Sequence, residues 1–290
     1  MPEPAAPPVD RKDFRQLRQQ GLARSVGHAI GSGIAAARDG LARALIAVGV
    51  TPNLLTVCGF AFTLAAAAFL AVGASGGWRD GPWIGLTFAA LLASAACDML
   101  DGAVARIAKL HTRSGAVLDS SIDRLSDGVI YLGIALHFAA RGNLTYVLLA
   151  GGASIAAYMI SYVKARAEDL IDDCTVGFWQ RGERVAAMLI AVGCGHVPAL
   201  LWSQAVGPTF TVARRLIYAF AVLRRQDAGA SPPVRGPLPG VLRYVALWRY
   251  PRGSVPYDLV AGANAAFLIV APWFSRLFTP AADPLSDLLA

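Results

Sequence analysis

Residues 98–123 read DMLDGAVARIAKLHTRSGAVLDSSID, and this stretch decides the class of the fold. Asp98 and Asp101 are three residues apart, and Asp119 and Asp123 are four apart, within otherwise apolar sequence. Residues three and four apart lie on one face of a helix, so the spacing predicts two helices that each present two carboxylates. An ionised aspartate inside a membrane-grade segment costs roughly 2.5–3.5 kcal/mol, which makes such residues candidates for function. For four acids of one sign, the expected partner is a cation.

The type of ligand indicates which cation. Oxygen ligands without His or Cys beside them favour Mg²⁺, Mn²⁺ or Ca²⁺ over zinc. Four carboxylates converge more naturally on two ions than on one, and paired divalent ions recur in phosphoryl chemistry. Gly102 leaves room for a ligand, and Arg106 supplies a planar group suited to phosphate. The alternative is that the acids are helix caps and surface charges, but capping explains one acid per helix and not two spaced pairs.

The same residues carry a resemblance to a known family. The pattern Asp-x2-Asp-Gly-x2-Ala-Arg-x8-Gly-x3-Asp-x3-Asp resembles the signature of the CDP-alcohol phosphotransferases, and all its fixed positions are filled within residues 98–123. These membrane enzymes make phospholipids from a CDP-activated lipid and an alcohol. The resemblance implies six transmembrane helices, a homodimer, and a signature on the second and third helices that faces a cytoplasmic cavity.

The composition is that of a polytopic membrane protein. Of the 290 residues, 56% are hydrophobic and only 16% are charged, and the mean hydropathy is +0.50. Apolar stretches close to the ~20 residues that cross a membrane predict six spans, at about 53–74, 83–101, 126–140, 144–163, 183–203 and 205–223. Together with the resemblance, these stretches predict an all-α fold, a polytopic membrane protein with a six-transmembrane-helix CDP-alcohol phosphotransferase core.

The chain divides into five predicted segments. Residues 1–10 form a disordered tail, 11–50 an N-terminal amphipathic interfacial helix, and 51–225 the transmembrane domain. Residues 226–254 form a Pro-, Gly- and Arg-rich linker, and 255–290 an extra apolar segment with an acidic tail. A soluble regulatory helix is the alternative for the second segment, whose expected apolar side consists of Leu17, Leu22, Val26, Ile30, Ile34, Leu41, Leu45 and Ile46.

The extra apolar segment departs from the family, whose members generally end soon after the sixth helix. Residues 255–277 are long enough to cross a ~30 Å hydrocarbon core as a C-terminal membrane helix. A hairpin or an interfacial helix is the alternative, favoured by Pro272. We expect the segment to pack beside the core without touching the Asp cluster.

Basic residues gather on one predicted face of the membrane. They lie in the N-terminal segment and in the links after the second and fourth spans, whereas the opposite face has only Arg79 and Arg141, and none around residues 196–198. The positive-inside rule predicts a protein of a bacterial-type inner or plasma membrane with its active site facing the cytoplasm. The net charge of +7 then needs no nucleic-acid partner.

The resemblance implies a role for each matching residue. Asp98, Asp101 and Asp119 match metal ligands, and Asp123 matches an aspartate that shares metal binding and activates the acceptor alcohol. We also expect Asp127, one turn further along, to orient a neighbouring helix or Arg124. The residues expected near the CDP-lipid are Pro52, Asn53, Thr56, Gly102, Ala105, Arg106 and Gly115.

Cations around the fourth, fifth and sixth spans indicate an anionic acceptor. An Arg inside a span has to face a cavity or a partner, and cations from three helices suit a phosphate ester. These elements resemble the phosphatidylinositol-phosphate synthase branch, in which Lys164, Arg184 and Arg215 match the positions that hold the acceptor phosphate. The alternative is that these residues are positive-inside anchors.

We therefore predict transfer of a phosphatidyl group from CDP-diacylglycerol to an alcohol with release of CMP, using Mg²⁺ or Mn²⁺, with two ions expected. The favoured acceptor is a phosphorylated polyol, inositol 1-phosphate. Glycerol 3-phosphate, the substrate of a phosphatidylglycerophosphate synthase, is the alternative acceptor. A hypothesis from another class is a cation transporter that uses the Asp cluster. Membrane lipids and a second copy in a homodimer are the other expected partners.

Overall fold

The computed structural model describes residues 26–76, 80–229, 250, 252 and 254–289, and every regular element in those residues is a helix. The class predicted from the composition, an all-helical polytopic membrane protein, is confirmed. Five of the described helices are long and apolar enough to cross a membrane: α3 (Pro52–Gly73), α4 (Trp83–Ile107), α6 (Leu144–Glu168), α8 (Val197–Asp227) and α10 (Val255–Phe274). The other elements are α2 (Val26–Ala47), α5 (Arg113–Ala139), α7 (Arg181–Cys194), the 3-10 turn η1 (Arg276–Phe278) and α11 (Pro284–Leu289).

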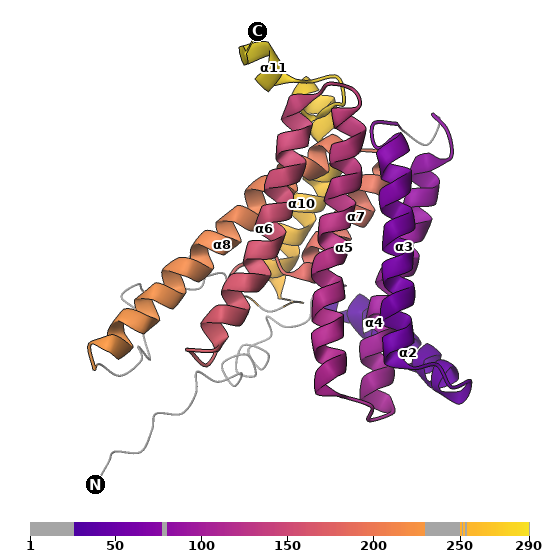
Figure 1. Ribbon diagram of the computed structural model, residues 1–290, viewed down its shortest axis with the longest axis vertical. Helices are drawn as coiled ribbons and strands as arrows, with labels where there is room; N and C mark the ends of the chain where they lie inside the picture. The colour runs from indigo at the N-terminus through magenta and orange to yellow at the C-terminus, as the bar shows by residue number, and fades with distance from the viewer. Residues whose placement is uncertain (1–25, 77–79, 230–249, 251, 253, 290) are drawn as a thin grey trace.

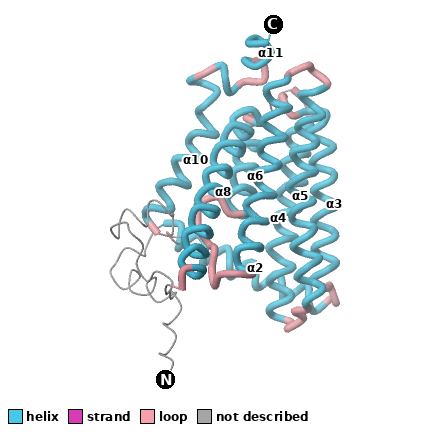
Figure 2. The backbone as a smooth tube through the Cα atoms, turned by 60° about the vertical axis from the view of Figure 1, so that its left-hand side comes forward, coloured by secondary structure: helices cyan, strands magenta, loops and turns pink. Residues whose placement is uncertain are grey.

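Long helices run side by side along the molecule (Figure 1, Figure 2). α3 contacts both α4 and α5, and α6 contacts both α5 and α8. α3 and α5 approach closely because Gly133 has no side chain: a Cβ there would collide with the backbone carbonyl of Ala67. Lipid tails are as apolar as the side chains, so close packing at small residues drives helix association in a membrane.

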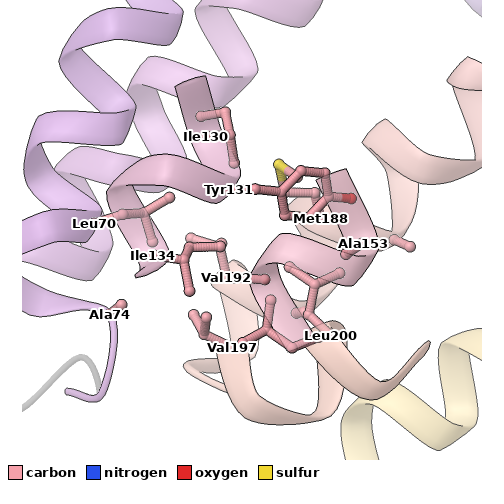
Figure 3. Close-up of a cluster of buried hydrophobic side chains, with 14 of the residues drawn as sticks. Leu70, Ala74, Ile130, Tyr131, Ile134, Ala153, Met188, Val192, Val197 and Leu200 are labelled. Carbon is pink, nitrogen blue, oxygen red and sulfur yellow. The ribbon is translucent and has the colours of Figure 1, made fainter. Parts of the chain in front are cut away.

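A shared core of buried apolar side chains joins α3 to α8 and α10. Figure 3 shows Leu70 of α3, Ile134 of α5 and Val192 of α7 gathered around one centre. Each of these three side chains is fully buried. α6 enters this core with Ala150, Ala153 and Ala157, which are also buried. Their small size lets neighbouring helices approach the α6 backbone.

The predicted division between the fifth and sixth spans is wrong. We expected spans at 183–203 and 205–223, but α7 ends at Cys194 and α8 begins at Val197. The chain turns at Gly195, whose φ is 74°, a left-handed conformation that glycine adopts without strain. Pro198 follows within the first turn of α8, where its missing N–H is not needed. The apolar pattern continues across this corner, so hydropathy alone misplaces the boundary.

The N-terminal helix is described only from Val26, so the prediction for residues 11–25 lies outside the described residues. α2 packs against α4: Ala42 is fully buried in a cluster with Leu100 and Val104, and Leu45 and Ile46 pack on it. Leu41, expected on the same apolar side, is 51% exposed. α3 begins where predicted, because Thr51 caps it by accepting a hydrogen bond from the Leu54 N–H at 3.3 Å.

α10 is one continuous helix that packs against α7 and α8, and not a hairpin. Pro272 lies inside it and cannot donate to the carbonyl of Leu268, four residues earlier. That carbonyl instead lies 2.9 Å from Nδ1 of His196, at the corner between α7 and α8. The replacement hydrogen bond allows the helix to continue through the proline.

The chain after α10 is hydrogen-bonded to the first turn of α6. Asp283 accepts hydrogen bonds from the backbone N–H groups of Leu144 and Thr145 at 3.1 and 3.0 Å, and from the Thr145 hydroxyl at 2.6 Å. Hydrogen bonds from Ser286 and Thr145 hold the pKa of the Asp283 carboxyl well below its usual range. α10 therefore reaches the end of the bundle opposite the Asp signature, where α11 lies (Figure 1).

Candidate active site

The signature lies where α4 ends and α5 begins. Thr112 caps α5 by accepting a hydrogen bond from the Gly115 N–H at 3.0 Å, and only residues 108–112 separate the two helices. This short link reverses the direction of the chain, and α3 packs against both helices. Carboxylate oxygens of Asp98, Asp119 and Asp123 all lie within 4.8 Å of one another. The structure thus brings together three of the four acids expected to bind metal.

Asp101 is the fourth acid, and its carboxylate has another partner. Its Oδ2 accepts a hydrogen bond from the Thr56 hydroxyl at 2.7 Å, and the residue is only 6% exposed. Thr56 was expected near the nucleotide, and its position places α3 directly against the Asp cluster. Asp101 remains one turn from Asp98 on the same helix.

Arg181, the first residue of α7, bridges the acid cluster. Its Nη1 contacts Asp98 and its Nη2 lies 2.9 Å from Oδ1 of Asp123. Arg181 was not among the residues expected from the sequence to bind a ligand. The signal was its place three residues before Arg184, which puts both cations on one helix face. Arg184 pairs with Asp127 at 2.5 Å. Asp127 thus contacts the neighbouring helix α7, which agrees with one of the two roles predicted for it.

A cavity of about 330 Å³ lies beside the cluster. Asp123 lines it together with the three residues expected to hold an acceptor phosphate, Lys164, Arg184 and Arg215. Side chains from α5, α6, α7 and α8 therefore meet in one place although they are up to 92 positions apart in the sequence, from 123 to 215.

Arg184 and Arg215 are buried, and nearby acids do not fully balance their charges. Arg184 is 2% exposed, and its Nε and Nη1 have no hydrogen-bond partner among the described residues. Arg215 is 1% exposed, and the acceptors that the described part of the chain offers it are neutral: the carbonyl of Val176 at 3.0 Å, the carbonyl of Ile160, and the Gln180 side chain at 2.8 Å. Buried cationic donors of this kind favour an anion in the cavity.

Lys164 lies at the more exposed rim of the cavity. Its Nζ is 3.8 Å from the Glu168 carboxylate, one turn further along α6, and its side chain is 37% exposed. An exposed pair at this distance contributes little to stability, so the ammonium group remains available to a ligand.

The residues expected around the CDP-lipid lie at the same end of the bundle. A Cβ at Gly102 would have nothing within 4 Å, so the helix surface there is open. A Cβ at Gly115 would lie 3.3 Å from the side-chain oxygen of Asn53, which places the start of α3 against the start of α5. Pro52 opens α3 and Ala105 is half-buried.

Arg106 points toward α2 rather than toward the acids. Its Nη2 lies 3.4 Å from Asp39, and its side chain is 55% exposed. A hydrogen bond from Arg38 is the main cause that lowers the pKa of Asp39, so this carboxylate is charged opposite Arg106.

A comparison with protein families decides the assignment. The family described as CDP-alcohol phosphatidyltransferase matches residues 49–223. The chain belongs to this family. It is therefore a CDP-alcohol phosphotransferase, a membrane transferase of phospholipid biosynthesis, and the cation-transporter hypothesis is set aside.

Two relatives of this CDP-alcohol phosphotransferase carry names that specify an acceptor. The archaetidylinositol phosphate synthase of Methanothermobacter thermautotrophicus is 36% identical over 185 residues, which is 61% of this chain and 87% of that protein. The phosphatidylinositol phosphate synthase of Cutibacterium acnes is 34% identical over 203 residues, which is 68% of this chain and 94% of that protein.

Crystal structures of the phosphatidylinositol phosphate synthase of Mycobacterium tuberculosis are also similar. The structure with CDP-DAG bound has a TM-score of 0.52 and 29% identity, covering 63% of this chain and 93% of that chain. The structure in complex with manganese and citrate has a TM-score of 0.53 and 29% identity, covering 63% and 88%. The family match ends at residue 223, so α10 and the residues after it lie outside the matched region.

Proposed function

We propose that this CDP-alcohol phosphotransferase joins CDP-diacylglycerol to inositol 1-phosphate, releasing CMP and forming a phosphatidylinositol phosphate. The observation that carries the proposal is the cavity in which Lys164, Arg184 and Arg215 line the wall together with Asp123. A phosphate group in this cavity would satisfy the buried N–H donors of Arg184 that have no partner in the described residues. The names of the two relatives support the same acceptor.

The acid cluster fits divalent metal ions. Its donors are carboxylate oxygens only, and three of the carboxylates lie within 4.8 Å of one another, which suits Mg²⁺ or Mn²⁺. We propose that Asp98, Asp101, Asp119 and Asp123 hold two such ions. When bound, the ions neutralise the pyrophosphate and the charge that develops on departing CMP. A similar synthase has been crystallised with manganese, which supports the choice.

Asp123 is the proposed general base. It belongs to the acid cluster and also lines the cavity, so its carboxylate lies between the two substrates' proposed sites. The acceptor hydroxyl gives its proton to Asp123 as its oxygen bonds to the phosphorus that carries diacylglycerol. The bond from that phosphorus to the bridging oxygen breaks, and CMP leaves with the electron pair.

The CDP-lipid is proposed to bind at the open surface formed by the starts of α3 and α5 and the end of α4. Gly102 offers space there, and Asn53 lies against Gly115. The other residues proposed for this site are Pro52, Thr56, Ala105 and Arg106.

The proposed arrangement in the membrane follows from the positions of the charges. Helices α3 to α8 form a six-helix core, α2 lies in the interface, and α10 is an additional span. The active-site end faces the cytoplasm, because the basic links gather there. We also propose a homodimer, as the family resemblance implies.

An acceptor panel tests the proposal. Purified enzyme receives CDP-diacylglycerol with inositol 1-phosphate, glycerol 3-phosphate, free inositol or serine, and the release of radiolabelled CMP is measured. We expect inositol 1-phosphate to react fastest, with kcat/KM at least about tenfold above that of free inositol, since charge-assisted hydrogen bonds contribute roughly 1.5–3 kcal/mol each. Equal rates with free inositol would refute an anionic acceptor. A preference for glycerol 3-phosphate would make the chain a phosphatidylglycerophosphate synthase.

A further inference from the structure

The segment that follows the family domain reaches the first turn of α7. We propose that Arg252 and Tyr257 are positioning residues: they hold Glu183, and through it they fix the helix turn that presents Arg181 and Arg184 to the active site. The inference rests on the proposed function in one respect, because it takes Arg184 as a ligand of the acceptor phosphate.

The contacts to Glu183 are dense. Arg252 donates from Nε to Oε1 at 2.7 Å and from Nη2 to Oε2 at 3.0 Å, and the Tyr257 hydroxyl donates to Oε1 at 2.5 Å. The Gln180 N–H adds a fourth hydrogen bond, to Oε2 at 3.1 Å, as part of the capping box of α7. A two-pronged arginine–carboxylate pair fixes orientation as well as distance.

Glu183 is buried and Arg252 is not. The Glu183 side chain is 5% exposed, whereas that of Arg252 is 63% exposed and lies across Gly182, where an added Cβ would be 2.9 Å from Nη2. Removing Arg252 would leave the buried carboxylate with Tyr257 and the backbone N–H as its partners. A buried charge that loses its ion-pair partner is strongly unfavourable, so the turn would have to move.

The turn that Glu183 fixes reaches three parts of the proposed site. Arg181 bridges Asp98 and Asp123, and Arg184 pairs with Asp127. Gln180, the cap of the same turn, accepts the hydrogen bond from Arg215 at 2.8 Å. A displacement here would move Arg184 and the Gln180 acceptor of Arg215, both of which line the cavity, whereas the residues proposed for the CDP-lipid lie on α3, α4 and α5.

α10 is also anchored away from Glu183, which provides a matched control. Asn264, two turns along α10 from Tyr257, donates a hydrogen bond to the Ser203 hydroxyl of α8 at 3.0 Å. Asn264→Ala should loosen α10 without altering the contacts of Glu183.

The test measures KM for each substrate in the full-length enzyme carrying Arg252→Gln, Arg252→Lys, Glu183→Gln or Asn264→Ala, together with the double variant of Glu183→Gln and Arg252→Gln. We expect Arg252→Gln to raise the acceptor KM about tenfold, with the KM for CDP-diacylglycerol changed less than about twofold. Arg252→Lys should recover part of the loss. The double variant should match Glu183→Gln alone, since Arg252 acts through that carboxylate. Asn264→Ala should keep the acceptor KM of the wild type.

Two results would overturn the positioning role: an unchanged acceptor KM in Arg252→Gln, or the same rise in Asn264→Ala. Arg184→Gln, measured in parallel, separates this failure from failure of the proposed function. If Arg184→Gln raises the acceptor KM and Arg252→Gln does not, only the positioning role fails. If neither variant changes it, both proposals fail. Should Arg252→Gln not fold, Tyr257→Phe removes one hydroxyl from the same carboxylate and is judged by the same KM comparison.

Discussion

Among single residues, Asp123 is the proposed general base. It belongs to the acid cluster and to the wall of the cavity at once. Asp123→Asn should lower kcat by at least about 10²-fold, the low end for a missing general base, while binding of CDP-diacylglycerol is largely kept. Single-turnover rates and equilibrium lipid binding check the two parts. A wild-type rate would reject the assignment of the base.

Arg181 should limit the loss of thermal stability when divalent ions are removed from the acid cluster. Carboxylates about 4 Å apart repel by roughly 1 kcal/mol in water-like surroundings and by more at lower dielectric, and the Arg181 guanidinium offsets this. Chelation of divalent ions should therefore lower the Tm of Arg181→Gln by at least about 2 °C more than that of the wild type. Arg166→Gln, which removes an exposed cation at the same end, is the control. Equal shifts in the three proteins would contradict the role.

At the scale of elements, the contact between α3 and α5 depends on the absence of a side chain at Gly133. Gly133→Ala should destabilise the protein by roughly 1–3 kcal/mol, because the new methyl meets the backbone carbonyl of Ala67, which cannot rotate away. Gly152→Ala is the control: its Cβ meets nothing within 4 Å, and alanine is favoured over glycine in a helix by ~1 kcal/mol. Thermal unfolding in detergent would measure both. Equal Tm values for the two variants would show that α3 and α5 can move apart without a loss of stability.

The sequence predicts elements well where their signals are local. Thr51 marks the start of α3 through its own hydroxyl group, next to the predicted start of the first span. The spacing of the acids on α4 and α5 indicated the cluster, because one short link joins the two helices. The corner at Gly195 was misplaced, since an apolar run hides a change of direction that depends on one glycine.

Contacts between distant segments could not be predicted. The bridge from Arg181 to Asp98 spans 83 positions, and the ion pair from Arg252 to Glu183 spans 69. Nothing in either local sequence specifies such a partner, because it depends on how whole helices pack. The sequence indicated that cations surround the site, but not which of them contacts an acid.

For the whole molecule, the path of α10 determines on which side of the membrane the residues after it lie. If α10 spans the membrane, Ser286 lies outside the cytoplasm. A cysteine at Ser286, in a chain without its four native cysteines, should react with an impermeant thiol reagent from outside intact cells. A cysteine at Ser114, exposed at the active-site end, should react only after the cytoplasmic face is opened. Labelling of the Ser286 position only after opening would reject the span.

The hydrogen bond between His196 and the Leu268 carbonyl links two interruptions of regular helix. One is the corner between α7 and α8, and the other is Pro272 inside α10. Pro272 frees the carbonyl and His196 meets it at 2.9 Å, where lipid would offer no partner to either group. His196→Leu alone leaves an acceptor unsatisfied, whereas Pro272→Ala alone adds a backbone N–H that can share the carbonyl with the histidine. The two changes together restore an ordinary helix beside an apolar corner. The positions should therefore be epistatic, with the double variant tolerated better than His196→Leu, so that an evolving chain would replace Pro272 before His196.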